Sequence, residues 1–440
     1  MRRYYVQTFG CQMNVHDSER VKGLLESLGM GEAAEPDAAD LLVFNTCTIR
    51  EKADERLVAH LMDARAAKRR DPDKVIAVGG CWSESMRDEV FELYPFVDLA
   101  FGPGAIHVLG EYVQAGGEID RGHFGTFDRF AGHLPSKRER PFQAWMQISQ
   151  GCNSTCSYCI VPSVRGREQS RRAADLVDEA TGLAADGVVE LTLLGQNVNS
   201  WGRDLPVAER IGFGELLRAL DAVDGIERIR FTSPHPKDMR DDVIAAMAEC
   251  PSVCEQLHLP LQSGSTRILK AMRRTYSRQR YLELVERIRD AVPGIALTTD
   301  IIVGFPGETE DDFAETLEVV DEVSYDHAFT FVYSPRRGTD AAAMEDQVPE
   351  DVKRTRIVRL VDLVQEHAAR HNAKLVGSRQ EVLVEGRSRT DHDVWRGRTR
   401  TNKTVNFTGS AEPGELVDVL VERSSSQTLT GRAAALAVVP

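Results

Sequence analysis

The sequence predicts an α/β protein built from three parts: an N-terminal open parallel α/β sheet, a central partial (β/α)6 barrel and a C-terminal small all-β barrel. Three patterns lead to this prediction. Short apolar strands alternate with amphipathic helices over residues 1–115, the alternation resumes in six βα units over 142–345, and beyond residue 375 short strands follow one another without helices. A chain of 440 residues is also too long for one ordinary domain.

In the N-terminal part, each of three strand candidates ends at a cysteine. The strands cover 4–9, 41–46 and 74–80, and the cysteines are Cys11, Cys47 and Cys81. Because sites in open α/β sheets form outside the carboxyl ends of the strands, three thiols would meet at one edge of the sheet. Three separately buried cysteines are the alternative, but the repeated placement at strand ends favours a shared site.

Residues 116–141 are polar and contain glycines without a sustained period, so we interpret this stretch as a linker. A long amphipathic helix over 351–374 closes the part that follows. We therefore divide the chain into an N-terminal domain (1–118), the linker (119–141), a central domain (142–374) and a C-terminal domain (375–440).

In the central part, six strand candidates alternate with helices. The candidates cover 143–149, 188–194, 227–232, 255–259, 295–303 and 328–333. Among the helices, 309–322 is the best marked, because Thr309 can cap it and acidic residues fill its first turn. The chemistry of such barrels lies at the carboxyl ends of the strands, and the first strand is directly followed by Cys152, Cys156 and Cys159.

Composition limits the classes of protein to which the chain can belong. Its net charge of -14 argues against nucleic acid as a partner unless local patches are basic. No run of about eighteen apolar residues indicates a membrane span, and the start lacks the apolar segment of a signal peptide. We therefore expect a cytoplasmic protein whose 8 cysteines stay reduced, as metal ligands or buried thiols.

The cysteines at 152, 156 and 159 form a C-x3-C-x2-C motif, whose fixed spacing indicates a ligand set. A structural zinc site would be closed by four protein ligands, and a ferredoxin would supply four cysteines to each cluster. No fourth cysteine lies nearby, since the next are Cys250 and Cys254, which we interpret as buried thiols. An iron–sulfur cluster on three thiolates leaves one iron open to another ligand. Structural zinc is the alternative.

This spacing, with Tyr158 before the last cysteine, resembles the radical S-adenosylmethionine (SAM) superfamily. The resemblance implies a [4Fe-4S] cluster whose open iron chelates the amino and carboxylate groups of SAM. An electron from the cluster then cleaves SAM to a 5′-deoxyadenosyl radical. It also implies SAM-binding loops at strand ends, where Gly195, Gln196 and Asn197 replace the usual Gly-Gly-Glu-like turn. Two further loops of this kind contain Gln262, Ser263 and Gly304.

Over essentially its whole length the chain resembles the methylthiotransferases of that superfamily. The resemblance rests on "TFGCQMN" (8–14), "NTC" (45–47), "GGC" (79–81) and "GCNSTCSYCIVPSVRGRE" (151–168). It implies that Cys11, Cys47 and Cys81 hold an auxiliary [4Fe-4S] cluster that carries sulfur, while the cluster on Cys152, Cys156 and Cys159 generates the radical. It also implies that the C-terminal module is a TRAM domain, a small OB-like RNA-binding barrel. No catalytic residue beyond the cluster ligands is expected.

Gln12 and Met13 in the first motif are typical of the branch that acts on N6-dimethylallyladenosine. We therefore expect sulfur insertion and methyl transfer at C2 of this nucleoside at position 37 of tRNA, next to the anticodon. The resemblance implies two SAM molecules per product, a reductant such as flavodoxin or ferredoxin, and a monomer. Threonylcarbamoyladenosine in tRNA and a ribosomal-protein aspartate are the alternative substrates. A zinc-containing RNA-binding protein or an electron carrier is the alternative class.

The C-terminal module has strand candidates at 380–386, 403–409, 415–424 and 428–433. Between residues 385 and 404 it carries a local excess of three positive charges, and Trp395 can stack on a base. We expect RNA contacts from Arg387, Arg389, Arg396, Arg398, Arg400 and Lys403, with a solvated strand face as the alternative. Four arginines follow the cysteine motif: Arg165, Arg167, Arg171 and Arg172. For these side chains we favour contact with RNA over pairing with acidic helices.

Overall fold

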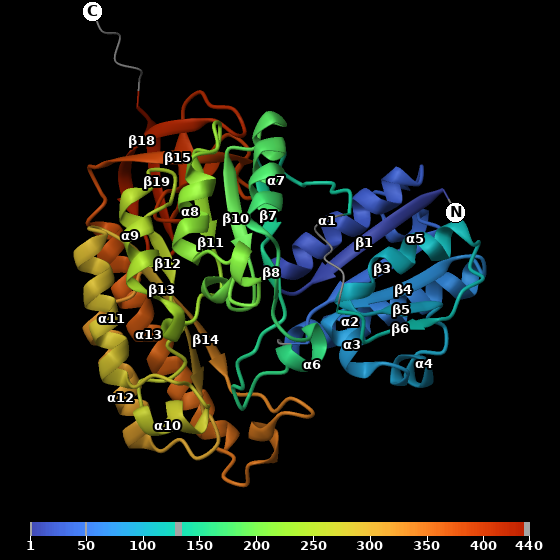
Figure 1. Ribbon diagram of the computed structural model, residues 1–440, viewed down its shortest axis with the longest axis horizontal. Helices are drawn as coiled ribbons and strands as arrows, with labels where there is room; N and C mark the ends of the chain where they lie inside the picture. Colours follow the sequence, from blue (N-terminus) through green and yellow to red (C-terminus); the bar gives the residue numbers. More distant parts are fainter. Residues whose placement is uncertain (1, 49–50, 128–133, 435–440) are drawn as a thin grey trace, which may run out of the picture.

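A computed structural model describes residues 2–48, 51–127 and 134–434. Figure 1 shows the N-terminal sheet domain (blue) to one side, the central strands and helices in the middle, and the C-terminal barrel (red) on top of the central part. The predicted α/β architecture with a small all-β barrel at its C-terminal end is confirmed. No helix within the described residues is long and apolar enough to reach across a lipid bilayer.

The N-terminal domain is a six-stranded parallel sheet in the order β2-β1-β3-β4-β5-β6. Its strands are β1 (Arg3–Phe9), β2 (Gly31–Glu32), β3 (Leu41–Thr46), β4 (Val75–Gly80), β5 (Leu99–Phe101) and β6 (Gly122–His123). Its helices are α1 (Gln12–Ser27), α2 (Glu51–Arg70), α3 (Cys81–Met86), α4 (Glu89–Leu93) and α5 (His107–Gln114). Apolar residues of α1 and α5 form a core on one face of the sheet, and those of α2, α3 and α4 form another on the opposite face.

The three predicted strands of this domain are confirmed as β1, β3 and β4. The structure adds β2, β5 and β6, which are only two or three residues long and have no room to show a period. Strand β6 belongs to the predicted linker, and it pairs with Ala100 and Phe101 of β5. For Gly122 and His123 the linker interpretation is therefore wrong, because backbone hydrogen bonds at a sheet edge need no apolar side chains.

The central domain contains two three-stranded parallel sheets, β11-β10-β7 and β12-β13-β14, joined by a bridge between Ile229 and Val253. The six strands match the predicted ones: β7 (Gln143–Gln147), β10 (Glu190–Leu194), β11 (Arg228–Phe231), β12 (Gln256–His258), β13 (Ala296–Val303) and β14 (His327–Val332). One large hydrophobic cluster fills the space between these strands and the surrounding helices. The predicted partial barrel is thus confirmed. Between β11 and β12 the two sheets are connected by this single bridge rather than by a continuous ladder.

Besides the short helix α6 (Val161–Arg165), the central domain has seven α-helices: α7 (Ala173–Ala185), α8 (Phe213–Asp221), α9 (Asp241–Glu249), α10 (Thr266–Ala271), α11 (Arg278–Ala291), α12 (Glu310–Val323) and α13 (Glu350–Ala373). The predicted cap of α12 is confirmed, because Thr309 accepts a hydrogen bond from the Asp312 amide and donates one to its carboxylate. Next to the cysteine loop lie helix α6 and a two-stranded ladder of β8 (Ser149–Gln150) and β9 (Gln169–Ser170).

The C-terminal domain is a closed five-stranded barrel in the order β15-β16-β17-β19-β18. Its strands are β15 (Arg379–Arg387), β16 (Trp395–Thr399), β17 (Thr404–Thr408), β18 (Leu416–Ser424) and β19 (Thr428–Ala433). Arg228 and Arg230 of β11 hold it in place by donating to the backbone carbonyls of Arg398, Thr399 and Arg400. Because Arg228 is the first residue of its strand, the barrel sits at the amino ends of the central strands.

Candidate metal centres

The cysteines at 11, 47 and 81 meet at the carboxyl edge of the N-terminal sheet. The strand register aligns Phe9 with Thr46 and Thr46 with Gly80, so the residues that follow the three strands lie side by side. The thiols of Cys11 and Cys47 are hydrogen-bonded, and this contact lowers the pKa of Cys11 to about 6. The three strand ends therefore bring three thiols to one place, as the sequence predicts.

Two glycines make room for this cysteine group. Gly10 has φ +151, and a Cβ at this position would lie 2.6 Å from the Cβ of Cys47. Gly80 has φ +96, and its Cβ would lie 2.4 Å from the carbonyl oxygen of Thr46. Any other residue would push the cysteine-bearing turns apart, so the two glycines let these turns approach each other closely.

Arg165 reaches this group from the central domain. Its Nε donates to Cys81 Sγ at 3.2 Å, and its Nη2 donates to Asp17 Oδ2 of helix α1 at 2.8 Å. Burial raises the pKa of Cys81, and the guanidinium of Arg165 opposes that effect. Arg165 is 5% exposed, so the predicted RNA contact of this residue is wrong. The same holds for Arg171, which is buried and paired with Glu179 at 2.6 Å.

The second cysteine group lies in the loop after β8. Gly151 starts the loop with φ +73, and a Cβ there would lie 2.1 Å from the Arg167 carbonyl oxygen. The loop is held by hydrogen bonds from the Cys152 amide to Gly166 and from the Cys159 amide to Cys156. Arg274 donates to Cys156 Sγ at 3.7 Å. Strand placement and loop geometry thus bring the three thiols to the carboxyl ends of the central strands.

All three thiols of this loop line one cavity of about 660 Å³. Polar and charged residues complete its wall, among them Arg167, Glu168, Asp204 and Asp340. A volume of this size lies within the range of small-molecule and cofactor sites, about 300–1,000 Å³. Within the part of the chain that the structure describes, no three His, Cys, Asp or Glu side chains are grouped so as to hold a single metal ion.

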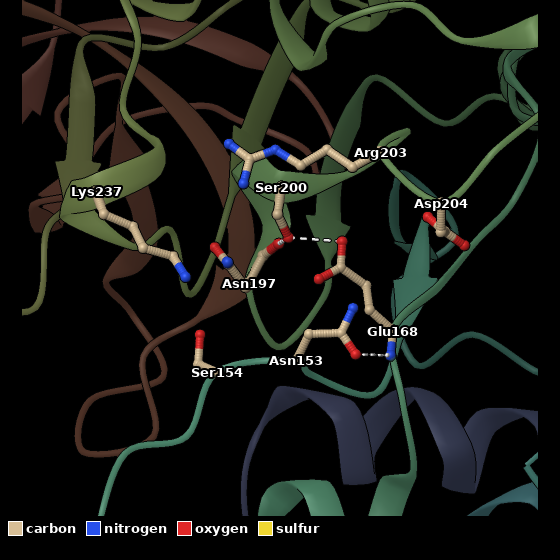
Figure 2. Close-up of a pocket in the computed structure, with 8 residues that line it drawn as sticks. All are labelled: Asn153, Ser154, Glu168, Asn197, Ser200, Arg203, Asp204 and Lys237. Atoms are coloured by element: carbon tan, nitrogen blue, oxygen red, sulfur yellow. Dashed lines mark hydrogen bonds between the residues drawn. The ribbon is translucent and has the colours of Figure 1, made fainter. Parts of the chain in front are cut away.

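A smaller cavity of about 180 Å³ adjoins the large one, and the two share Asn153, Ser154, Glu168 and Asp204. Figure 2 shows Lys237 entering it from one side and Glu168 from the other, with Asn197 and Ser200 between them. Ser200 Oγ donates to Glu168 Oε1 at 2.7 Å. Burial raises the pKa of Glu168, and the hydrogen bond from Ser200 opposes it.

The predicted SAM-binding residues separate into two groups. Asn197 lines the small cavity; its Nδ2 donates to Asp238 at 2.7 Å, while its buried Oδ1 has no partner within the described residues. Both polar side-chain atoms of Gln196 are likewise buried without a partner there. Gly195 precedes them, and a Cβ on it would lie 2.6 Å from Ser149 Oγ. Of these three residues only Asn197 lines either cavity, and its orphaned oxygen there fits a polar ligand.

Like Gly195 and Gln196, the other three predicted residues line neither cavity. Ser263 is fully buried and accepts a hydrogen bond from the Ser265 amide, next to Thr316. A Cβ at Gly304 would lie 2.4 Å from Lys353 Cγ, and the Gly304 amide donates to Glu308. Gln262 has φ +70, and its backbone bridges to Ile301. The structure uses these residues in packing and turns, and SAM contact by them stays a prediction.

Three residues at these sites are not predicted from the sequence: Glu168, Arg203 and Lys237. A fourth, Arg165, is predicted to contact RNA instead. Glu168 lies in "VRGRE" directly behind the cysteine motif, and its proximity to the motif was a usable signal. Arg203 pairs with Asp238 at 2.5 Å, which places it beside Asn197. Nothing in the sequence singles out Arg203 or Lys237, because they come from loops that only the fold brings to the cavity.

The six basic residues predicted to contact RNA are used differently by the barrel. Arg400 pairs with Glu255 at 2.8 Å and Lys403 with Asp326 at 2.6 Å, so both attach the barrel to the central domain. Arg396 and Arg398 flank Glu385 at 3.7 and 3.4 Å. Arg387 and Arg389 are exposed, and Arg387 lies 3.6 Å from the centre of the Trp395 ring. RNA contact stays a prediction, for which these last two arginines are the most accessible candidates.

Three family models match the chain. The radical SAM superfamily matches residues 146–320, an uncharacterised protein family named UPF0004 matches 3–102, and the TRAM domain matches 373–434. These three matches cover the central, N-terminal and C-terminal parts in turn.

Several curated relatives carry the name tRNA-2-methylthio-N(6)-dimethylallyladenosine synthase. The one from Thermobifida fusca (strain YX) is 50% identical over 430 residues, covering 96% of this chain and 87% of the relative. The one from Acidothermus cellulolyticus is 51% identical over 435 residues, covering 97% and 87%. The one from Clostridium novyi (strain NT) is 46% identical over 436 residues, covering 98% and 96%.

Solved structures share the fold at much lower identity. The radical S-adenosylmethionine methyltransferase TsrM from Kitasatospora setae, with cobalamin and a [4Fe-4S] cluster bound, superimposes with a TM-score of 0.55 at 14% identity, covering 78% of this chain and 77% of that one. The cobalamin-dependent radical enzyme OxsB gives a TM-score of 0.53 at 12% identity, covering 83% and 56%. These likenesses support the overall α/β fold.

Proposed function

The chain belongs to the family of tRNA-2-methylthio-N(6)-dimethylallyladenosine synthases, and on that premise we propose that it methylthiolates C2 of N6-dimethylallyladenosine at position 37 of tRNA, next to the anticodon. The product is 2-methylthio-N6-dimethylallyladenosine. The single observation that carries this proposal is the pair of three-cysteine groups, one on each of two facing domains and linked by Arg165. One group alone would indicate only a radical SAM enzyme.

We propose that the two groups hold one [4Fe-4S] cluster each. The auxiliary ligands are Cys11, Cys47 and Cys81, and the radical SAM ligands are Cys152, Cys156 and Cys159. The fit rests on the all-sulfur donor sets and on the glycines that allow close turns beside each group, Gly10 and Gly80 in one case and Gly151 in the other. With SAM, these clusters supply the radical that activates the C2–H bond, the sulfur and the methyl group.

We further propose that SAM lies across the two adjoining cavities. The large cavity places a ligand beside the three thiols, and the small one offers the unpartnered Oδ1 of Asn197, the Glu168 carboxylate and the Lys237 ammonium. The Gly-Gly-Glu-like turn of this chain lacks its glutamate, and Glu168 supplies a carboxylate next to the same turn from another loop. This arrangement suits a ligand that carries both cationic and anionic groups.

Replacing Glu168 by Gln tests its place in the SAM site. Because the neutral amide keeps the shape but loses the charge-assisted hydrogen bond, we expect the Kd for SAM to rise about 10- to 100-fold. Equilibrium dialysis of SAM against anaerobically reconstituted protein measures this change without relying on turnover. Glu209→Gln is the matched control, since Glu209 is exposed and pairs with Arg172 at 3.3 Å. An unchanged Kd for the Glu168 variant would remove Glu168 from the proposed site.

For the RNA, we propose that Arg387 and Arg389 contact the tRNA backbone, with Trp395 beside Arg387. The double variant Arg387→Ala/Arg389→Ala should bind tRNA more weakly. The plot of log K for tRNA binding against log salt concentration has a negative slope, and this slope should become shallower by about 2 because two phosphate contacts are lost. Filter binding at several salt concentrations measures both effects. Arg432→Ala is the control, because Arg432 is exposed and pairs with Glu422 on the same barrel. Equal slopes for all three proteins would contradict the contact.

The direct test of the activity uses reconstituted protein, SAM, a reductant and tRNA that carries N6-dimethylallyladenosine. Digestion of the RNA should release 2-methylthio-N6-dimethylallyladenosine, and its absence would overturn the proposal. Parallel reactions with threonylcarbamoyladenosine tRNA and with a ribosomal protein should give no methylthio product. We also propose flavodoxin or ferredoxin as electron donor, two SAM per product, and a monomer that works in the cytoplasm.

A further inference from the structure

Arg165 connects the two cysteine groups physically. It ends helix α6, which follows directly after the loop that carries Cys159, yet its side chain enters the N-terminal domain. There it donates to Cys81 Sγ at 3.2 Å and to Asp17 Oδ2 at 2.8 Å. Ile160 and Val164, from the same segment, are buried in one cluster with Cys81.

A buried guanidinium is costly unless anionic groups surround it. Asp17 supplies one negative charge and is 2% exposed, so the Arg165–Asp17 pair is shielded from solvent. The Nε–H is not used by Asp17 and is directed at the sulfur of Cys81. Since a cluster ligand is a thiolate, this second bond becomes a charge-assisted hydrogen bond when the group binds metal.

We propose that Arg165 is a positioning residue for the auxiliary cluster, holding the Cys81 sulfur in place and raising the reduction potential of that cluster. The inference rests on the proposed assignment of a cluster to Cys11, Cys47 and Cys81. Hydrogen bonds to ligand sulfurs and nearby charges set the potentials of iron–sulfur clusters. A positive charge favours the reduced form, which carries one more electron, so Arg165 makes the cluster easier to reduce.

The connection has a consequence for how the two sites work together. The segment from Cys159 to Arg165 carries a ligand of one cluster at one end and a hydrogen-bond donor to the other cluster at its other end. The position of the auxiliary ligand Cys81 is thus tied to the loop that forms the radical SAM site. Another ion pair between the same two domains, Arg337 with Glu89 at 2.7 Å, is exposed and is not bonded to any cysteine.

The test uses the full-length chain with Cys152, Cys156 and Cys159 replaced by alanine, reconstituted anaerobically so that only the auxiliary group can hold a cluster. Its midpoint potential is measured by EPR-monitored redox titration. We expect Arg165→Gln to lower the potential and Asp17→Asn to raise it, because these variants remove charges of opposite sign. Loss of iron to a chelator should be about 10- to 100-fold faster in Arg165→Gln.

Arg337→Gln is the matched control, because it removes a charge pair between the same domains without touching a cysteine, and we expect it to leave the potential unchanged. A potential unaffected by Arg165→Gln would overturn the inference. Shifts of the midpoint potential in the same direction in Arg165→Gln and Asp17→Asn would also overturn it. A general loosening of the site would shift the potential in the same direction in both variants, whereas the loss of opposite charges shifts it in opposite directions. A background variant that binds no iron would instead overturn the cluster assignment, and the inference with it.

Discussion

Replacing Cys156 by alanine is expected to abolish reductive cleavage of SAM, whereas Cys47→Ala should keep much of that cleavage and lose sulfur insertion. Cys156 is one of three thiols in the loop at the large cavity, and Cys47 belongs to the group on the other domain. With only three protein ligands per cluster, the loss of one leaves too few to retain it. Chromatography of 5′-deoxyadenosine and of the digested tRNA measures the two activities separately.

Cys250→Ala is the control for both variants. Cys250 directly follows the C-terminal end of helix α9 and belongs to neither cysteine group. Its burial in the central core confirms its interpretation as a buried thiol. We expect the control to keep both activities and about eight irons per chain. If the Cys156 and Cys47 variants lost both activities equally, the division of labour between the clusters would be wrong.

Arg228→Ala should separate the C-terminal barrel from the central domain. Arg228 is completely buried, and it donates to the carbonyls of Arg398 and Glu381 and, at 2.7 Å, to the Glu381 carboxylate. Because 41% of the Glu381 side chain is exposed, its charge can be hydrated when Arg228 is removed, and the cost comes from the lost hydrogen bonds of the guanidinium, about 1.5–3 kcal/mol each. We expect chemical denaturation to show an early transition for the barrel, and limited proteolysis to cut between α13 and β15.

Arg218→Ala provides the comparison, because Arg218 is on the surface and pairs with Glu215 and Glu249. Exposed pairs contribute about 0–1 kcal/mol, so this variant should unfold like the unchanged protein. A single unshifted transition in the Arg228 variant would show that the barrel is held by other contacts, such as Arg400 with Glu255.

The cysteine groups could be predicted from sequence because strand ends and motif spacing are local signals. Parallel pairing then makes Cys11, Cys47 and Cys81 neighbours without further information. Arg165 could not be predicted in the same way, since an arginine shortly after a loop of mostly polar residues looks like a surface residue. Only the packing of α6 against Cys81 turns it inward.

The C-terminal barrel shows a similar limit. Strand β16 reads "WRGRT", and its inward residues are Gly397 and Thr399, so no apolar alternation marks it. Arg400 and Lys403 could be recognised as basic but not as partners of Glu255 and Asp326, because those acids lie about 145 and 77 residues earlier in the chain. Charge alone does not distinguish an RNA contact from a contact between domains.

The barrel and the radical SAM cysteines lie at opposite ends of the central strands. Cys152 follows the carboxyl end of β7 and β8, whereas Arg400 and Lys403 bind residues just before β12 and β14. The longest of these strands, β13, has 8 residues, and at about 3.3 Å per residue it extends for about 26 Å. An RNA bound as proposed, at both the barrel and the radical SAM cysteines, must span at least this distance, whereas a free nucleoside is too short to contact both places.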